Sequence, residues 1–164
     1  MRGGGGWAVL ALILAAGCRI EDRTPTGSRR DDQSIRAVVA TYYRSLSTRD
    51  WPSSRSVFAD SAQVLVRGVD DTGSSRFATA EAYHLELIRR ARDQRVEAGE
   101  VLVARLDVRQ EGELAAVWVA ARHHVSDPDR AESRSADHFV LRRVDGAWRV
   151  VGFYSTPASD LPAR

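Results

Sequence analysis

Residues 114–121, which read LAAVWVAA, constrain the fold of this chain more than any other stretch. Successive side chains of a β-strand point to opposite faces. One face of this strand would carry Leu114, Ala116, Trp118 and Ala120, and the other would carry Ala115, Val117, Val119 and Ala121. A strand that is apolar on both faces needs cover on both. We expect helices to cover one face, and either a second subunit or a loop to cover the other.

The period of two extends through the second half of the chain and predicts long antiparallel strands. We expect these strands at residues 100–109, 114–125, 136–144 and 147–155, with a polar loop at 126–133. In the first strand the apolar side chains would share one face: Leu102, Ala104, Leu106 and Val108. Asp145-Gly146 separates the last two strands, and glycine supplies the positive φ that a tight hairpin turn needs.

The first half of the chain shows helical spacing instead. Asp31 and Asp32 can cap a first helix, whose apolar face would carry Ile35, Val38, Val39, Tyr42 and Leu46. A short second helix that reaches Phe58 is expected after Asp50, because Pro52 is tolerated in a first turn. Thr79 can cap a third helix, whose apolar face would carry Ala80, Tyr83, His84, Leu87 and Ala91.

A strand at residues 62–68 and a turn or loop at 69–75 lie between the second and third helices. The order of elements predicts an α+β fold, in which three helices of the N-terminal half pack on one face of a strongly curved antiparallel sheet.

The start of the chain has the parts of an export signal. Met1 and Arg2 precede an apolar run at residues 7–16, which is shorter than the roughly 20 residues of a membrane-spanning helix. The run ends in Ala15, Ala16, Gly17 and Cys18, the only cysteine of the chain. This ending resembles the lipobox of bacterial lipoproteins, with leucine at Leu14, one place earlier than the commonest pattern.

The resemblance implies cleavage before Cys18 and a diacylglyceryl thioether on its thiol. Two or three acyl chains such as palmitate would hold the protein on a bacterial membrane, extracytoplasmic in the cell envelope, whereas one chain binds only marginally. We divide the chain into a signal peptide at 1–17, a disordered tether at 18–30, one domain at 31–157 and a tail at 158–164. An ordinary secretory peptide cut elsewhere, or a short anchor with an incidental cysteine, is the alternative.

Two segments carry a resemblance to a known fold family. They are IRAVVATYYRSLSTRDWPSSRSVFADSAQVLVRG at residues 35–68 and HFVLRRVDGAWRVVGFYST at residues 138–156. Both are similar to nuclear transport factor 2-like domains, including the SnoaL-like group. The resemblance implies a cone, in which a curved sheet wraps around helices and leaves a pocket at its open end. It also implies a homodimer through the outer sheet face, with a monomer as the alternative.

Charge and composition exclude some partners. The chain has 24 Lys+Arg against 22 Asp+Glu, all of the basic residues are arginine, and the formal net charge is +2. Arginine and acid are interspersed, so nothing resembles a basic nucleic-acid stripe, and we expect no nucleic-acid partner. Histidines do not occur at HxH or HxxxH spacing, so we expect no metal site. We also expect no cofactor.

Aromatic side chains and histidines are the candidates for lining a pocket, because aromatic walls with a few polar tips suit small organic ligands. The candidates are Tyr43, Trp51, Tyr83, Trp118, His124, His138 and Tyr154. Each could instead be a core residue. Arg134 and Arg142 could enter the cone to hold an anion, although a surface position is the default for arginine.

No catalytic residue is assigned. The steroid isomerases of the family place an aspartate base on the first strand, where this chain has Leu65, Val66 and Arg67. His84 lies on the apolar face of the third helix and is expected to be a core residue. The adjacent residues His123 and His124 must point to opposite faces, as must Asp137 and His138. Neither pair can therefore form a side-chain dyad within its strand.

Three functions stay open. The preferred one is a lipoprotein whose cone binds a small apolar or amphipathic molecule, or has no known ligand. The second is an interaction module at the cell envelope that uses the sheet face or the loop at 126–133. The third is an enzyme of isomerase, cyclase or dehydratase type that uses His124 or His138.

Overall fold

The computed structural model describes residues 28–67, 74–93, 99–124 and 132–158. Several predictions lie outside these residues: the signal peptide, Cys18 with the tether up to residue 27, most of the loop at 126–133, and the tail from residue 159. Among the described residues, no helix is long and apolar enough to span a membrane.

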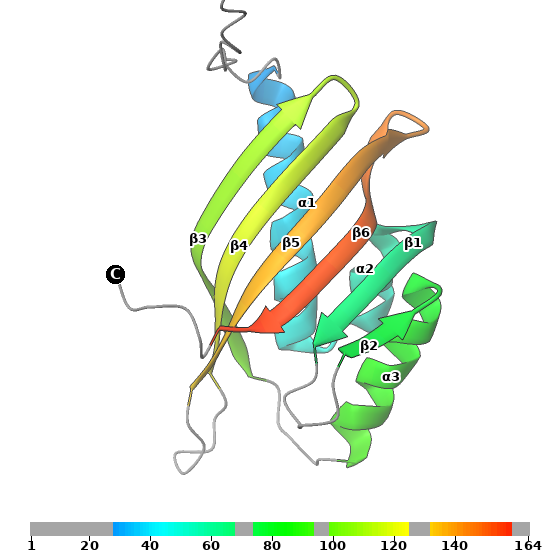
Figure 1. The fold of residues 1–164 in the computed structure, drawn as a ribbon, viewed down its shortest axis with the longest axis vertical. Helices are drawn as coiled ribbons and strands as arrows, with labels where there is room; N and C mark the ends of the chain where they lie inside the picture. The colour runs from blue at the N-terminus through cyan, green and yellow to red at the C-terminus, as the bar shows by residue number, and fades with distance from the viewer. Residues whose placement is uncertain (1–27, 68–73, 94–98, 125–131, 159–164) are drawn as a thin grey trace, which may run out of the picture.

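Three helices lie against one face of a curved six-stranded sheet, as predicted (Figure 1). The helices are α1 (Arg29–Thr48), α2 (Trp51–Ser56) and α3 (Ala80–Asp93). The sheet has the order β2-β1-β6-β5-β4-β3. Its strands are β1 (Phe58–Arg67), β2 (Ser74–Phe77), β3 (Glu100–Glu111), β4 (Leu114–His124), β5 (Ser133–Val144) and β6 (Ala147–Pro157). The long strands curve around α1, and α3 lies beside β1 and β2 (Figure 1).

Helix α1 begins earlier than predicted. Ser28 is its N-cap, and the Ser28 hydroxyl accepts from the backbone N–H of Asp31 at 3.1 Å. Arg29 and Arg30, which we had assigned to the tether, therefore belong to the first turn. Asp31 and Asp32 do not cap the helix but lie in its first turn, where the helix dipole favours negative charge.

The starts of the other two helices agree with the prediction. The side chain of Asp50 caps α2 by accepting from the backbone N–H of Ser53 at 3.1 Å, and a proline follows in the first turn. The hydroxyl of Thr79 accepts from the backbone N–H of Ala82 at 3.1 Å at the start of α3. Phe58, which was predicted to extend the second helix, instead begins β1.

Strand β4 follows the predicted alternation. The side chains of Ala115, Val117, Val119 and Ala121 are buried beneath the helices. We refer to this side of the sheet as the inner face and to the other as the outer face. On the outer face Leu114 is 54% exposed and Trp118 is 53% exposed.

Strand β3 departs from the predicted alternation because it contains a β-bulge. Its register with β4 shifts between Val103 and Arg105, so Ala104 is the extra residue. An extra residue sends the side chains that follow it to the opposite face. Leu106 consequently packs against the core, whereas Leu102 lies on the outer face and is 48% exposed. The predicted common face of these two leucines is wrong for this reason.

The sheet is not wholly antiparallel, contrary to the prediction. β1 runs parallel to β6, with Val64 opposite Phe153. β2 is an additional antiparallel edge strand that pairs with β1, at a place where the sequence predicted the end of a loop. The four residues of β2 read SSRF, which is too short and too polar for a period of two to be detected.

The core lies between α1 and the inner face. The ring of Tyr42 is at its centre, with centroid separations of 5.2 to 5.7 Å to Tyr43, Phe58, Phe139 and Phe153. Such tilted and edge-on ring pairs stabilise a core beyond the area that they bury.

Polar contacts connect the start of α1 with the ends of β5 and β6. Asp31 pairs with Arg143 and accepts from the indole Nε1 of Trp148 at 3.3 Å. The predicted tight turn between β5 and β6 is present, with positive φ values of 49° at Asp145 and 78° at Gly146. Trp148 is buried beside this turn.

Candidate functional site

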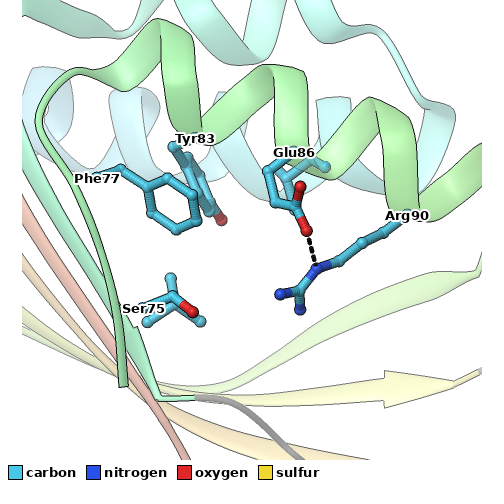
Figure 2. A pocket seen from close by; sticks show the side chains of 7 residues that line it. Ser75, Phe77, Tyr83, Glu86 and Arg90 are labelled. Atoms are coloured by element: carbon cyan, nitrogen blue, oxygen red, sulfur yellow. Dashed lines mark hydrogen bonds and ion pairs between the residues drawn. The ribbon is translucent and has the colours of Figure 1, made fainter. Parts of the chain in front are cut away.

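A small cavity of about 60 Å³ lies between α3 and the β1–β2 pair (Figure 2). Its lining residues are Val66, Ser75, Phe77, Tyr83, Glu86, Leu87 and Arg90. The rings of Phe77 and Tyr83 lie together on one side, and the side chains of Glu86 and Arg90 lie on the other (Figure 2). The cavity is therefore bounded by hydrocarbon and aromatic surface with one ion pair at its edge.

The charge at the edge of the cavity is balanced. The carboxylate of Glu86 accepts from Arg89 Nη2 and from Arg90 Nε, both at 2.7 Å. These two guanidinium groups lower the pKa of Glu86 to about 2. Glu86 is thus ionised near neutral pH, and its charge is directed to the arginines of its own helix.

Tyr83 connects the cavity to the core. Its ring lines the cavity, and its hydroxyl lies 2.8 Å from the hydroxyl of Tyr42. Burial raises the pKa of Tyr83, and the negative charge of Asp137 adds to this effect. Both hydroxyls are therefore neutral. Asp137 is related to the cavity wall by register, since it lies opposite Ser155 and Ser155 lies opposite Val66.

A polar cluster lies on the inner face where β4 ends and β5 begins. Tyr43 Oη donates to Asp137 Oδ2 at 2.5 Å, and Ser135 Oγ donates to the same oxygen at 3.1 Å. His123 Nε2 lies 2.9 Å from Ser135 Oγ. These four residues form what we term the inner polar cluster. Asp137 is only 3% exposed, so a carboxyl group is embedded in the interior of the cone.

Burial shifts the acid and the base of the inner polar cluster toward their neutral forms. It raises the pKa of Asp137, while the hydroxyls of Tyr43, Ser155 and Ser135 favour the ionised carboxylate and oppose the shift. Burial also lowers the pKa of His123, and the negative charge of Asp137 opposes that shift. Asp137 Oδ1 has no hydrogen-bond partner among the described residues. Shifted pairs of this kind gather at functional sites.

Four of the predicted pocket residues lie on the outer face and not inside the cone. Trp118, His138 and Tyr154 are neighbours in register on β4, β5 and β6. Their rings stack, with centroid separations of 3.9 Å between Trp118 and His138 and 6.1 Å between His138 and Tyr154. His124 is exposed one residue beyond the inward-facing His123. The alternation that buries Val117 necessarily turns these residues outward.

Two predicted pocket residues do lie inside. Tyr83 lines the cavity, and Tyr43 belongs to the inner polar cluster. Trp51 is half-buried at the start of α2 and is not among the residues that line the cavity. Arg134 and Arg142 are exposed, as is usual for arginine.

His84 is a core residue, as predicted. Its Nε2 lies 2.8 Å from the hydroxyl of Ser54, and its Nδ1 lies 2.6 Å from the carbonyl oxygen of Ala80. Asp137 and His138 point to opposite faces, also as predicted. Within the part of the chain that the structure describes, no three His, Cys, Asp or Glu side chains come together as metal ligands would.

Sequence reasoning missed the combination of His123, Ser135 and Asp137. A signal for it exists in the inward-facing positions of two strands. On β4 the apolar series that starts at Ala115 ends in a histidine, and on β5 the buried Phe139 and Leu141 are preceded by Ser135 and Asp137. The polar residues lie at the same end of the strand pair because the strands are antiparallel, with His123 opposite Ser133, two residues before Ser135.

Solved structures with the same fold come from several bacteria. A domain of unknown function with a cystatin-like fold from Nostoc punctiforme has a TM-score of 0.68 and 17% identity, over 82% of each chain. A nuclear transport factor 2-like protein from Pseudomonas putida has a TM-score of 0.65 and 18% identity, over 79% of this chain and 87% of that chain. A protein described as "putative scytalone dehydratase" from Novosphingobium aromaticivorans has a TM-score of 0.62 and 13% identity, over 82% and 90%. These likenesses confirm the predicted cone-shaped fold.

No curated protein matches this chain at a significant level. The sequence model of the family described as "putative lumazine-binding" matches residues 30–153, which include nearly the whole described domain. The chain therefore belongs to the "putative lumazine-binding" family, whose domain here has the nuclear transport factor 2-like fold.

Proposed function

We propose that this protein is a lipid-anchored, extracytoplasmic binding protein whose cone holds a small, mainly apolar molecule. The observation that carries the proposal is the cavity beneath α3, with its lining of Val66, Phe77, Tyr83 and Leu87. Apolar cavities with a few polar groups nearby are the usual form of small-molecule sites.

The size of the cavity limits what it can hold. At about 60 Å³ it is well below the roughly 300–1,000 Å³ of typical ligand pockets. It would take an apolar part of the molecule, such as a ring edge or a short alkyl group. The inner polar cluster would face the rest, because Asp137 is in register with Ser155 on β6, and Ser155 is in register with Val66 of the cavity wall.

The family description names lumazine, which makes this compact bicyclic heterocycle a rational probe. The similar structure described as a dehydratase has only 13% identity to this chain, so its activity gives no substrate here. Phenol is a second probe, because it is small, neutral and mostly apolar.

The binding proposal is tested with a bulky substitution in the cavity. Val66→Phe would fill the space between β1 and α3, and we expect it to abolish binding of phenol and of lumazine by the full chain carrying Cys18→Ser. Leu85→Phe is the matched control, since Leu85 is 60% exposed on the same helix that covers the cavity. Binding that survives Val66→Phe, or no binding of either probe by the unsubstituted cavity, would contradict the proposal.

The anchoring proposal rests on Cys18 and on the apolar run before it. We expect metabolic labelling with palmitate to mark the intact chain and to be lost in Cys18→Ser. The same substitution should release the protein from the membrane fraction. An unlabelled chain, or unchanged membrane association in Cys18→Ser, would contradict the lipid anchor.

We also propose self-association through the outer face, because a specific feature favours it. Leu114, Trp118 and Tyr154 are 54%, 53% and 46% exposed there, which is unusual for large apolar side chains that share one face of a sheet. Sedimentation of the full Cys18→Ser chain should show a dimer that Trp118→Arg dissociates. A monomer at all accessible concentrations would contradict this second proposal.

A further inference from the structure

The direction of each hydrogen bond in the inner polar cluster follows from the protons that its members carry. Ser135 has one hydroxyl proton and lies 3.1 Å from Asp137 Oδ2 and 2.9 Å from His123 Nε2. An ionised carboxylate only accepts, so Ser135 donates to Asp137. The oxygen of Ser135 must then accept from His123, because the reverse would leave the Asp137 and Ser135 lone pairs facing each other. His123 therefore carries its proton on Nε2.

This assignment leaves an acceptor on the other side of the ring. A neutral imidazole has a single N–H, so Nδ1 of His123 keeps an unprotonated lone pair. Tyr43 supports the arrangement from α1, since its hydroxyl donates to Asp137 Oδ2 at 2.5 Å and favours the ionised, oriented carboxylate. Asp137 Oδ1, which has no partner among the described residues, is a second acceptor nearby.

The position of His123 makes its acceptor suitable for a ligand. Asp137 is almost completely buried, whereas His123 is half-buried at the end of β4. The charged group that acts on His123 is Asp137 on β5, while the facing residue on β3 is the apolar Val101. The His123 ring is therefore more accessible than the carboxylate of Asp137.

We infer that His123 Nδ1 is the hydrogen-bond acceptor that fixes the polar end of the bound molecule. The ligand is accordingly a neutral, mainly apolar molecule that carries a hydroxyl or N–H group. This inference rests on the proposed binding function. Ser135 and Asp137 are positioning residues, because they act on the ligand only by selecting the His123 tautomer. An anion would be repelled by Asp137, and a ligand with acceptors alone would face the His123 lone pair.

The first test measures the tautomer directly and needs no ligand. Long-range ¹H–¹⁵N spectra of the full Cys18→Ser chain at pH 8 distinguish the two neutral forms of each histidine. We expect His123 to be protonated on Nε2, and Ser135→Ala to shift it toward a mixture of tautomers while His124 stays unchanged. A His123 protonated mainly on Nδ1 in the unsubstituted cluster would overturn the inference.

The second test uses two probes that differ in one donor. Phenol carries a hydroxyl, whereas anisole has the same ring with a methoxy acceptor. We expect phenol to bind about 3- to 10-fold more tightly at pH 8, the range that one net hydrogen bond supplies. This order is opposite to the hydrophobicity of the two probes. In His123→Phe the preference should disappear, and in His124→Phe, the control on the outer face, it should persist.

The possible outcomes distinguish a failure of the role of His123 from a failure of the proposed binding function. Equal binding of phenol and anisole, or a preference that survives His123→Phe, overturns the role of His123 and leaves the proposed binding function intact. Failure of both probes to bind overturns the proposed function, and with it the ligand role of His123. A phenol preference that is lost in His124→Phe places the site on the outer face and overturns both.

Discussion

The two ends of the cone interior are built on the same strands but have opposite chemistry. Near the β5–β6 turn, the inward positions hold Leu141 and Val150, both fully buried. Toward the other end, the inward positions of β4 and β5 hold His123, Ser135 and Asp137. Both sets occupy inward-facing positions of the sheet, so the chemical difference between the two ends comes from the side chains at those positions.

The comparison shows that the stability of the fold does not explain the polar side chains at this end. A buried carboxyl group costs free energy unless it is fully hydrogen-bonded, and one oxygen of Asp137 lacks a partner among the described residues. Apolar residues at the same positions would extend the core of the other end. Polar residues that are retained at such a cost are expected where a protein binds or reacts with something.

The largest expected effect lies at the apolar end. Leu141→Ala removes a fully buried side chain and should lower the free energy of unfolding by about 2–5 kcal/mol, measured by urea denaturation. Val140→Ala on the outer face of the same strand is the control and should cost less than about 1 kcal/mol. Equal costs for the two substitutions would contradict the distinction between inner and outer faces.

At the polar end, Tyr43→Phe removes the hydroxyl that donates to Asp137 at 2.5 Å. Hydrogen bonds to charged groups contribute about 1.5–3 kcal/mol, so we expect the free energy of unfolding at pH 8 to fall by that amount. The same change should raise the pKa of Asp137 further. Tyr154→Phe, on the exposed outer face, is the matched control and should have almost no effect. A Tyr43→Phe variant as stable as the parent would argue against an ionised Asp137.

Asp137→Asn tests the raised pKa of Asp137 through the pH dependence of the free energy of unfolding. Burial raises the pKa of Asp137 above the unfolded value of 3.8, so the folded state binds this proton more tightly. Stability contributed by the group should therefore fall as pH rises from about 4 through the folded pKa, by about 1.4 kcal/mol per pKa unit of difference. The parent chain should gain stability relative to Asp137→Asn as the pH is lowered from 8 toward the unfolded pKa of 3.8.

Two comparisons make the pH experiment specific. Asp107→Asn, in the outward-facing position opposite Trp118, is the matched control variant. Burial lowers the pKa of His123, so protonation of this group lowers the free energy of unfolding as the pH falls below 6.5. This pH effect is opposite to that of Asp137 and must be measured separately with His123→Phe. A parent chain that loses stability relative to Asp137→Asn on acidification would contradict the raised pKa.

The smallest expected effect lies on the outer face. Leu114→Ser changes a side chain that is 54% exposed and should alter the free energy of unfolding by less than about 0.5 kcal/mol in dilute solution. It should nevertheless weaken the proposed dimer, which equilibrium sedimentation would detect. A large loss of monomer stability would show that this face is covered within one chain.

The sequence predicted the parts of the fold that follow from periodicity. The alternation on β4, the tight turn at Asp145-Gly146 and the Thr79 cap of α3 are all local signals, and all are confirmed. The parallel pairing of β1 with β6 was not predicted, because register between distant strands leaves no local pattern. The bulge at Ala104 was missed for a related reason, since alanine is compatible with either face.

The candidate site was predicted less well than the fold. We predicted Trp118 and Tyr154 to line a pocket because their side chains are aromatic. The alternation of β4 and β6 turns both side chains outward. Alternation alone could place His123 and His124 on opposite faces, but it could not decide which face is inside. That decision depends on the helices, which bury the face of Val117 and Ala121 and therefore the face of His123.

The central claim is that ligands enter the interior of the cone and reach its polar end. Amide and side-chain chemical shifts of the isotope-labelled full Cys18→Ser chain, recorded at pH 8 during a phenol titration, test this claim most directly. The account predicts saturable shifts at Tyr83, Leu87, His123 and Asp137, with Trp118 and Tyr154 unaffected. Shifts confined to Trp118, His138 and Tyr154, or the absence of saturable shifts anywhere, would contradict it.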